Sequence, residues 1–233
     1  SGRGKDGLKV NRPTSNVVIR KSIALRGAGG IVCGTEIAGG VRNVYMYDCV
    51  FEGTDQAFRF KTRRPRGGFV ENIYVERVRA NVKRQALYCD MLGSARWVGE
   101  LAQRYPAREI TPLTPWFANI SIHDVEITGC STLVDVSALP EKPVKNFFFG
   151  NVKAHCDRIG KICDATKFSM KDVRIESCDT VMRIDNCDYA SFFGFSNVTT
   201  GSSVKIEKTG GECRYLNVQT YPLVPVTVSY THL

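Results

Sequence analysis

A nine-residue pattern recurs along this chain and constrains its fold more than any other feature. Each copy begins with a polar residue, often Asn, and has apolar residues at positions +1, +3, +6 and +8. The clear copies begin at Asn43, Asn72, Asn119, Asn146 and Lys167, and weaker copies begin at Asn16, Tyr189 and Glu212. Most starts lie 21 to 29 residues apart. This period is typical of a solenoid of stacked turns rather than of a globule.

The spacing of the apolar residues within each copy indicates strands. Apolar residues two apart form one face of a strand, and the step of three between +3 and +6 predicts a bend. A third alternating stretch follows near +15 and +17, at Phe58/Phe60, Leu87/Cys89, Val134/Val136, Met182/Ile184 and Val204/Ile206. Three short strands per turn with apolar side chains inward predict an all-β fold, a parallel β-helix. A leucine-rich repeat is the alternative, but it needs a Leu-dominated consensus and often a helical stripe, which the chain lacks.

Residues 1–227 are predicted to form a single β-helix domain. No apolar run reaches the roughly 20 residues of a membrane-spanning helix. The interval from Asn72 to Asn119 is about one turn too long, and its surplus, residues 93–116, contains three prolines and both tryptophans. We therefore expect a loop that leaves the coil there. Such a loop is either functional or a flap packed over one end of the core.

The nine cysteines are interpreted as buried thiols. Cys33, Cys89 and Cys163 fall near one inward column of successive turns, where free Cys packs as a small hydrophobic residue. The chain has no CxxC motif and no Cys/His cluster with zinc spacing, so neither a metal nor a cofactor is predicted. Disulfides or a metal site remain the alternative.

Both ends of the chain are unusual. The chain opens on Ser1 without a Met or a signal peptide. Residues 228–233, VSYTHL, resemble a translated sequencing adapter, and we interpret them as a non-native tail. They are given no weight in the fold prediction.

The formal net charge is +9, from 32 basic and 23 acidic residues, and the excess is unevenly distributed. Since Phe58 and Phe60 point inward, Arg59 and Lys61 project together from the outer face, roughly 6–7 Å apart at the strand rise. In other turns we expect the same outward columns to hold Tyr88/Asp90, Asp135/Ser137, Arg183/Asp185 and Lys205/Glu207. A polar strip is therefore predicted along one wall of the coil.

Three interpretations of this strip are open. Charged residues occur on the outer face of any solvated sheet. A nucleic-acid site is disfavoured, because the strip lacks interleaved aromatic residues and no helix is available for a groove. An acidic polysaccharide fits better, because an extended wall suits an extended chain. Arg can bind a carboxylate with two hydrogen bonds, and Lys adds a point charge.

Several segments, taken in order, resemble glycoside hydrolase family 28, the polygalacturonases and rhamnogalacturonan hydrolases. The resemblance is strongest over residues 1–92, and the repeat alone continues beyond them. It is carried by the segments Ser1-Gly2-Arg3, 11–20, 27–36, 39–44 and Arg59-Phe60-Lys61-Thr62-Arg63-Arg64. It implies a right-handed parallel β-helix of the pectin-lyase-like type, here truncated at the N-terminus.

The resemblance also implies a function: inverting hydrolysis of pectin in a secreted or periplasmic setting, with an acidic polysaccharide as partner. The Arg-x-Lys motif that binds a substrate carboxylate maps onto Arg59 and Lys61. The catalytic aspartates of the family precede the Ser-Gly that is Ser1-Gly2 here, so this chain alone is expected to be inactive. The family commonly has Gly-His-Gly where this chain has Gly27-Ala28-Gly29. Ala28 therefore implies either a subgroup that works without that His or reduced activity.

Two other classes remain open from the sequence. The first is a non-catalytic polysaccharide-binding or structural β-helix, in which Ala28 marks lost chemistry. The second is a pectate lyase, which needs a carboxylate cluster for Ca²⁺. Asp90, Asp135 and Asp185 share a wall but lie on different turns and at different offsets, which disfavours the lyase.

Overall fold

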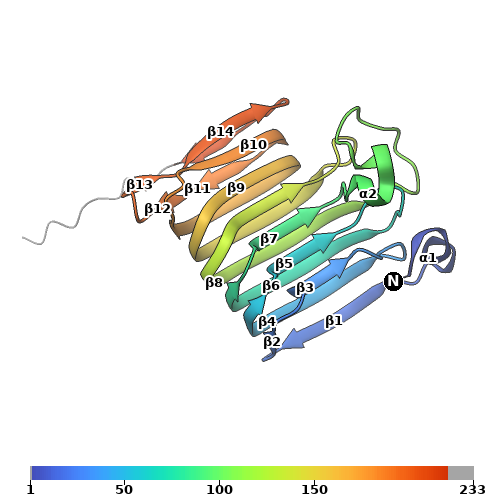
Figure 1. Ribbon diagram of the computed structural model, residues 1–233, viewed down its shortest axis with the longest axis horizontal. Coiled ribbons are helices and arrows are strands. Elements are labelled where there is room, and N and C mark those ends of the chain that lie inside the picture. Colours follow the sequence, from blue (N-terminus) through green and yellow to red (C-terminus); the bar gives the residue numbers. More distant parts are fainter. Residues whose placement is uncertain (1, 220–233) are drawn as a thin grey trace, which may run out of the picture.

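The structure, a computed structural model, describes residues 2–219 as a coil of stacked parallel strands (Figure 1). The tail predicted at residues 228–233 lies outside the described residues. None of the helices between residues 2 and 219 is long and apolar enough to cross a membrane. The elements are α1 (Gly4–Val10), β1 (Thr14–Arg20), β2 (Ile23–Leu25), β3 (Gly29–Gly34), β4 (Val41–Thr54), β5 (Gln56–Lys61), β6 (Phe69–Val82), β7 (Gln85–Asp90), α2 (Ala95–Val98), the 3₁₀ turn η1 (Gly99–Ala102), β8 (Trp116–Ser137), β9 (Val144–Glu176), β10 (Val181–Asp188), β11 (Ser191–Phe193), β12 (Ser196–Asn197), β13 (Ser202–Ser203), β14 (Lys205–Gly210) and β15 (Asn217–Gln219).

Turn-to-turn pairing confirms the predicted all-β parallel β-helix. All the described strands belong to one sheet, in which β4 pairs with β6, β6 with β8, and β8 with β9, all in parallel. Within residues 2–219 antiparallel pairing is limited to β12 with β13 and a bridge between Leu139 and Lys142. Each turn thus places its strands beside the equivalent strands of the next turn.

Each turn has three faces, which we name from the turn that begins at Asn43. Face one is residues 43–47, face two is residues 49–53 and face three is residues 56–61. Asn43 (φ 53°) and Asp48 (φ 54°) open faces one and two in the left-handed region. Asn and Asp tolerate this conformation better than most residues. A single left-handed residue thus makes each of these two bends.

The asparagines that open face one form a ladder along the coil. Asn43 donates a side-chain hydrogen bond to Asn16, Asn72 to Asn43, and Asn119 to Asn72, each at 3.1 Å, and Asn146 donates to Asn119 at 2.9 Å. Each inner asparagine therefore donates to one neighbour and accepts from the next. The ladder explains why Asn recurs at this position of the repeat.

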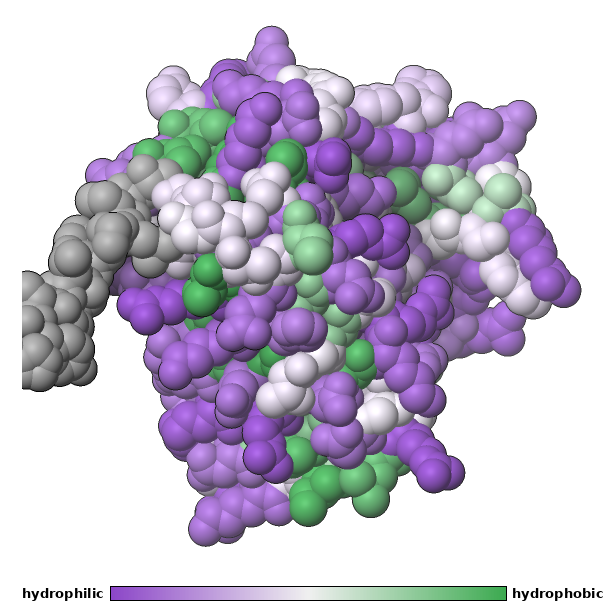
Figure 2. Space-filling model, turned by 60° about the vertical axis from the view of Figure 1, so that its left-hand side comes forward, coloured by the Kyte–Doolittle hydropathy of each residue, from purple (hydrophilic) through white to green (hydrophobic). Residues whose placement is uncertain are grey.

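The core is a set of inward columns that run along the coil. One column on face one contains Met46, Val75, Ile122, Phe149 and Met170, all buried. Neighbouring turns also stack aromatic rings, as in Phe147 and Phe168, whose centroids are 4.8 Å apart. Hydrophilic side chains predominate on the face shown in Figure 2, with hydrophobic ones in separate patches. Apolar burial is thus continuous along the interior.

Three sequence-based assignments were wrong. Within residues 2–219 the last left-handed start is Tyr215, not Glu212, and its ring stacks on that of Tyr189 at 4.6 Å. Cys163 faces outward beside Ser137, one residue out of phase with the inward Cys33 and Cys89. Lys205 pairs with Val181, so only Glu207 joins the outward strip. All nine cysteines are free thiols, and six of them are buried.

The segment between β7 and β8 leaves the coil and carries α2 and η1 (Figure 1). Arg64, which follows face three of the Asn43 turn, anchors this segment. Its Nε and Nη2 donate to Glu141 at 2.6 and 2.7 Å, while Nη1 donates to the carbonyl oxygens of Leu101 and Gln103 at 2.9 and 2.8 Å. The Arg64 and Glu141 side chains are only 5% and 4% exposed. The contact is therefore a desolvated, doubly hydrogen-bonded ion pair.

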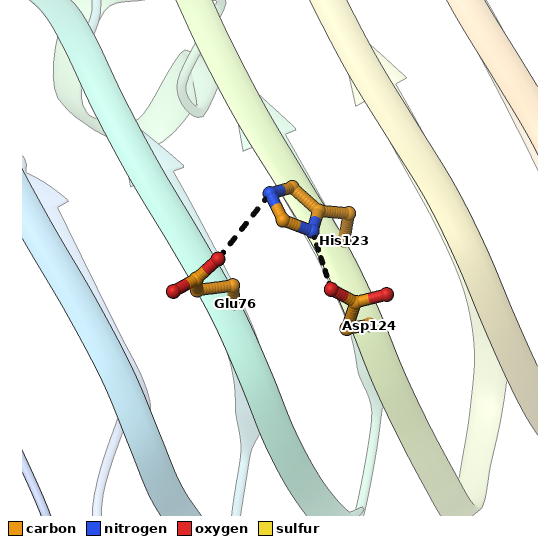
Figure 3. A group of neighbouring side chains, drawn as sticks. All are labelled: Glu76, His123 and Asp124. Carbon is orange, nitrogen blue, oxygen red and sulfur yellow. Dashed lines mark hydrogen bonds and ion pairs between the residues drawn. The ribbon is translucent and has the colours of Figure 1, made fainter.

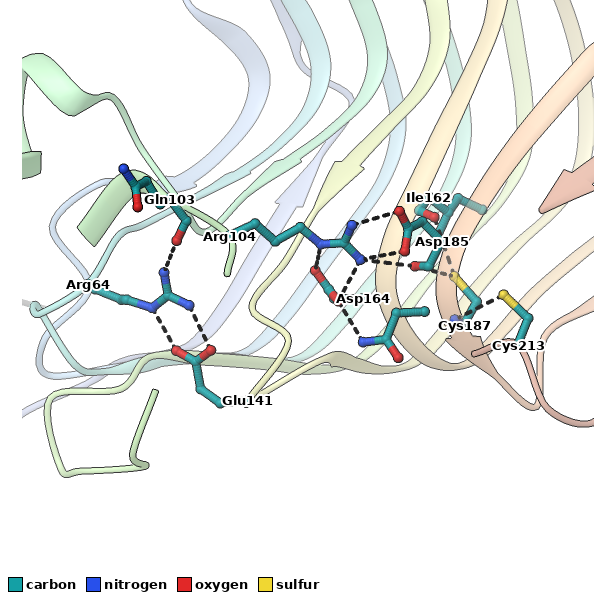
Figure 4. A network of polar contacts seen from close by, with 10 residues as sticks. Arg64, Gln103, Arg104, Glu141, Ile162, Asp164, Asp185, Cys187 and Cys213 are labelled. Carbon is teal, nitrogen blue, oxygen red and sulfur yellow. Dashed lines mark hydrogen bonds and ion pairs between the residues drawn. The ribbon is translucent and has the colours of Figure 1, made fainter. Parts of the chain in front are cut away.

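A second arginine, Arg104, fixes the same segment directly after Gln103 (Figure 4). Arg104 donates to both carboxylate oxygens of the fully buried Asp164, at 2.6 and 2.9 Å, and contacts both of those of Asp185, at 2.9 and 2.8 Å. Asp164 also accepts a bond from Asn186. The segment is thus tied to several turns through charge-assisted bonds, which are stronger than neutral ones.

The asparagine ladder predicts a specific ranking of variants at Asn72. Asn72→Ala loses two side-chain hydrogen bonds. It also puts alanine, whose side chain cannot hydrogen-bond to the local backbone, in the left-handed region. We therefore expect the free energy of unfolding to fall by about 2 kcal/mol. Asn72→Gly loses the same bonds without left-handed strain and should lose less. Urea unfolding measures both. A glycine variant as unstable as the alanine variant would contradict the role given to the left-handed bend.

The Arg64–Glu141 pair predicts a loss of stability in acid. Burial raises the pKa of Glu141, but the hydrogen bonds and the charge of Arg64, together with backbone hydrogen bonds, outweigh it and the pKa is lowered. The pair's contribution is therefore complete above the ordinary value of 4.5 and is lost as the pH falls through the lower folded value. Glu141→Gln should cost about 3 kcal/mol near neutral pH, since it leaves Arg64 without its anion.

The measurement is urea unfolding at several pH values from about 6 to about 3. The wild-type stability should fall more steeply with acid than that of Glu141→Gln, because the variant lacks the titrating group. Parallel curves would show that Glu141 contributes no pH-dependent stability.

Candidate functional site

The candidate site is the outer surface of face three, where β3, β5, β7, β8, β9 and β10 lie in register. Two outward columns run along it. The first column contains Val32, Arg59, Tyr88, Asp135, Lys161, Arg183 and Glu207. The second contains Gly34, Lys61, Asp90, Ser137, Cys163 and Asp185. Because the backbone ladder fixes these positions, the columns form a rigid polar wall.

Arg59 and Lys61 project from β5, as the alternation predicted. Arg59 is half-buried, and its Nη1 has a single long contact, 3.4 Å, with the carbonyl oxygen of Ala28. Lys61 lies in the next outward position, where its Nζ is 3.5 Å from Asp90 Oδ2. The Arg59 guanidinium thus keeps most of its donors available for a ligand, whereas the Lys61 charge already has an anionic neighbour.

Asp90 is fully engaged by its surroundings. Its Oδ2 accepts a bond from the Tyr88 hydroxyl at 3.1 Å and faces Lys61, while its Oδ1 accepts from the backbone N–H groups of Leu92 and Gly93 at 3.0 and 2.9 Å. The Asp90 side chain is 12% exposed. Burial, with Asp90 adding to it, raises the pKa of Tyr88. Tyr88 therefore stays a neutral hydrogen-bond donor, and Asp90 acts as an anchor for this wall.

Asp135 lies on the next turn along the same wall. Burial raises the pKa of its carboxyl group, Lys161 and Arg158 oppose the rise, and Asp90 adds to it. A hollow of about 250 Å³ adjoins this group and is lined by Gln85, Thr132, Val134, Asp135, Arg158, Gly160, Lys161, Asp179 and Arg183. The wall thus contains a recess with three cations. A raised pKa in a recess is a property that active sites share with structural networks.

Sequence reasoning identified Arg183 on this wall but missed Lys161. The reason is Gly160, which occupies the inward position between Val134 and Met182 and so hides the alternation. Gly160 has φ 104°, and a Cβ there would lie 1.9 Å from the carbonyl oxygen of Val134. The signal that could have revealed Lys161 is its spacing from Asn146, once glycine is allowed at an inward position.

The structure also places Ala28, the residue found where the resembling family commonly has His. Ala28 is exposed, and only its backbone carbonyl takes part in the site, through the contact with Arg59. The position therefore supplies no acid or base.

Away from this wall, one cluster in the described part of the chain could offer ligands to a metal ion: Glu76, His123 and Asp124. His123 Nδ1 lies 2.8 Å from Asp124 Oδ2, and Nε2 lies 3.8 Å from Glu76 Oε2 (Figure 3). The other Glu76 oxygen is bound by Tyr45 and Arg77. Both ring nitrogens and the Glu76 carboxylate are already engaged, so the cluster is a hydrogen-bonded corner between faces one and two.

Comparison with known proteins adds one distant relationship. No protein-family model matches the chain. A probable polygalacturonase from Vitis vinifera is 25% identical to it over 156 residues. The match covers 66% of this chain but 30% of that protein, so the chain spans less than a third of its relative. The chain thus combines a parallel β-helix and a charged wall with a distant sequence similarity to a probable polygalacturonase.

Gly34 should be essential for the position of Lys61. It has φ 119°, and a Cβ there would lie 1.7 Å from the carbonyl oxygen of Lys61. Gly34→Ala adds this backbone clash to left-handed strain of about 1–2 kcal/mol. Gly27→Ala is the matched control, because Gly27 has φ 95° but no atom within 4 Å of an added Cβ. Thermal unfolding should rank Gly34→Ala well below Gly27→Ala, and equal losses would contradict the close approach.

Proposed function

We propose that this chain belongs to a pectin-directed glycoside hydrolase and carries a substrate-binding wall for galacturonate-containing polysaccharide. The observation that carries the proposal is the row of cations on face three: Arg59, Lys61, Lys161 and Arg183. The similarity to a probable polygalacturonase supports the same class. An enzyme of this class acts outside the cell, which we propose for this protein also.

The geometry of face three suits an extended anionic chain. Successive turns are separated by about 4.8 Å, the spacing of paired strands, so cations several turns apart form a line along the coil axis. Arg59 offers a planar fork that fits a carboxylate with two hydrogen bonds. The 250 Å³ recess beside Lys161 and Arg183 gives a second point of attachment on the same line. A uronate polymer presents carboxylates in such a line.

Hydrolysis with inversion requires two carboxylic groups about 6.5–9.5 Å apart, one as acid and one as base for water. We assign this chain the binding role and leave the catalytic pair to other residues of the intact protein. Asp90 supports this division, because all its contacts serve Lys61, Tyr88 and two backbone N–H groups. A carboxylate held in this way has no free geometry for activating water.

The alternative is a non-catalytic polysaccharide-binding β-helix. Ala28 favours it, since this position lacks the imidazole common in the resembling family. Both alternatives predict binding of acidic polysaccharide at face three, and they differ only in turnover. Reducing-sugar release from polygalacturonate by the full-length protein therefore separates them.

The test of the binding wall is substitution at Arg59 and Lys61. We expect Arg59→Ala and Lys61→Ala to weaken oligogalacturonate binding, or kcat/KM where there is turnover, by about 1.5–3 kcal/mol each. Lys83→Ala, which removes an exposed charge elsewhere, should have little effect. If both wall variants stay within about twofold of wild type, the assignment of the wall is wrong.

Lys61 needs a further control because its removal leaves Asp90 without a cation. In the double variant Lys61→Ala/Asp90→Asn the uncompensated anion is absent. If Lys61 binds the ligand directly, affinity stays low in the double variant. If Lys61 only neutralises Asp90, affinity returns towards wild type, and the ligand contact then rests on Arg59.

A further inference from the structure

Face two, on another side of the coil from face three, contains a long groove that the proposed function does not use. One hollow of about 560 Å³ is lined by residues of four turns, including Arg77, Arg79, Glu126 and Lys153. A second hollow of about 460 Å³ continues it and includes Arg174. The two hollows share Glu126 and Lys153, so they form one groove that crosses successive turns.

The groove follows from the bend between faces one and two. Its floor consists of buried residues such as Val78 and Val125, and its walls are the outward side chains on either side of the left-handed corner. The backbone register places Arg79 beside Glu126 and Glu126 beside Lys153. Five turns are separated by four spacings of about 4.8 Å, which gives a groove roughly 19 Å long along the coil axis.

The charges in the groove fall into two groups. Several already have partners: Arg77 is paired with Asp48, and Asp124 contacts Asn151 and His123, whereas Glu176 lies 3.5 Å from His155, an ion pair only when the imidazole is protonated. The others, Arg79, Glu126, Lys153 and Arg174, have no hydrogen bond or ion pair from their side chains to any residue between 2 and 219. Three cations are therefore available to a ligand, together with the Glu126 carboxylate and, while His155 is neutral, the Glu176 carboxylate.

This unpaired set defines the chemistry of a ligand. Three cations along a line suit an extended molecule that carries anionic groups at intervals, because charge-assisted hydrogen bonds from Arg and Lys are strong. Glu126, between Arg79 and Lys153, calls for a hydrogen-bond donor at the same place. A glycan of uronic acids supplies both, because each sugar has a carboxylate and hydroxyl groups. Polyphosphate supplies only hydrogen-bond acceptors. Single-stranded nucleic acid stacks its bases on aromatic side chains, and none of the residues that line this groove is Phe, Tyr or Trp.

We propose that the face-two groove is a second binding site for an acidic polysaccharide, separate from the wall on face three. Arg79, Lys153 and Arg174 bind the carboxylates, and Glu126 accepts a hydrogen bond from a sugar hydroxyl. The ligand class rests on the proposed function. Two sites on different faces would let one protein hold a polymer at two points, which raises the overall affinity through effective concentration.

The experiment is calorimetric titration of the full-length protein with tetragalacturonate at one fixed, low ionic strength. Wild type should bind two molecules per chain. The variant Arg79→Ala/Lys153→Ala/Arg174→Ala should bind one, with the affinity of the groove reduced by about tenfold or more. Lys5→Ala/Lys9→Ala/Lys83→Ala removes the same charge at exposed positions outside the groove and should still bind two. Two unchanged sites in the groove variant would overturn the proposal.

A variant that binds more tightly than wild type cannot be explained by loss of folding. Val50 lines the groove beside Arg79, and Val50→Lys adds a fourth cation there without removing any proposed contact, so it should tighten tetragalacturonate binding severalfold. It should have no such effect on the methyl ester of the same oligomer, whose carboxylates are neutral. Polyphosphate of matched charge that binds wild type as tightly as tetragalacturonate would show a general anion patch and would also overturn the proposal.

The two sites fail separately in this design. If Arg59→Ala/Lys61→Ala removes one molecule and the groove variant removes none, the groove proposal fails and the proposed function stands. If the groove variant removes the only bound molecule while the face-three variant has no effect, the face-three site fails and the groove stands. Loss of both sites in the combined variant completes the assignment.

Discussion

Backbone hydrogen bonding between equivalent strands of successive turns is the interaction on which the rest of this molecule depends. It aligns inward side chains into continuous columns and outward side chains into equally spaced rows. The register depends on the bends, where single left-handed residues such as Asn43 and Asp48 turn the chain in one step. The asparagine ladder repeats the turn-to-turn bonding with side chains at one of these bends. Position along the coil is thus set by the backbone, and function can vary in the outward rows.

The two polar surfaces use this regularity differently. On face three, Lys61 and Tyr88 both contact Asp90, so this wall is preorganised. It leaves Arg59 and Lys161 for a ligand, whereas Arg183 lies 3.9 Å from Glu207. On face two the corner is internally paired, while Arg79, Lys153 and Arg174 remain available in a groove. A preorganised site loses less conformational freedom on binding. The long side chains of Arg79, Lys153 and Arg174 in the groove are exposed, so they lose conformational freedom when a ligand binds.

Much of this fold could be predicted from the sequence because the repeat encodes it directly. Asn43 and Asn72 marked the bends, and alternating apolar residues gave the inward columns and placed Arg59 and Lys61 outward. The failures have physical causes. Gly160 fills an inward position without a side chain and so hid Lys161, and Tyr215 stands in place of Asn at the last bend of the described residues. The periodicity of the sequence does not specify side-chain directions or the angle between faces. The ion pair of Lys61 with Asp90 and the groove on face two depend on both, so they could not be predicted.

The segment that leaves the coil between β7 and β8 has a consequence for how the molecule comes apart. In a solenoid each turn contacts only its neighbours, so turns can be lost one at a time from an end. Here Arg64 and Glu141 belong to turns on either side of the segment, and Arg104 reaches Asp164 and Asp185 on later turns still. Turns that are not neighbours are therefore joined by buried charge. Fraying that reaches this region must break these pairs together, so the middle of the coil unfolds as one cooperative block.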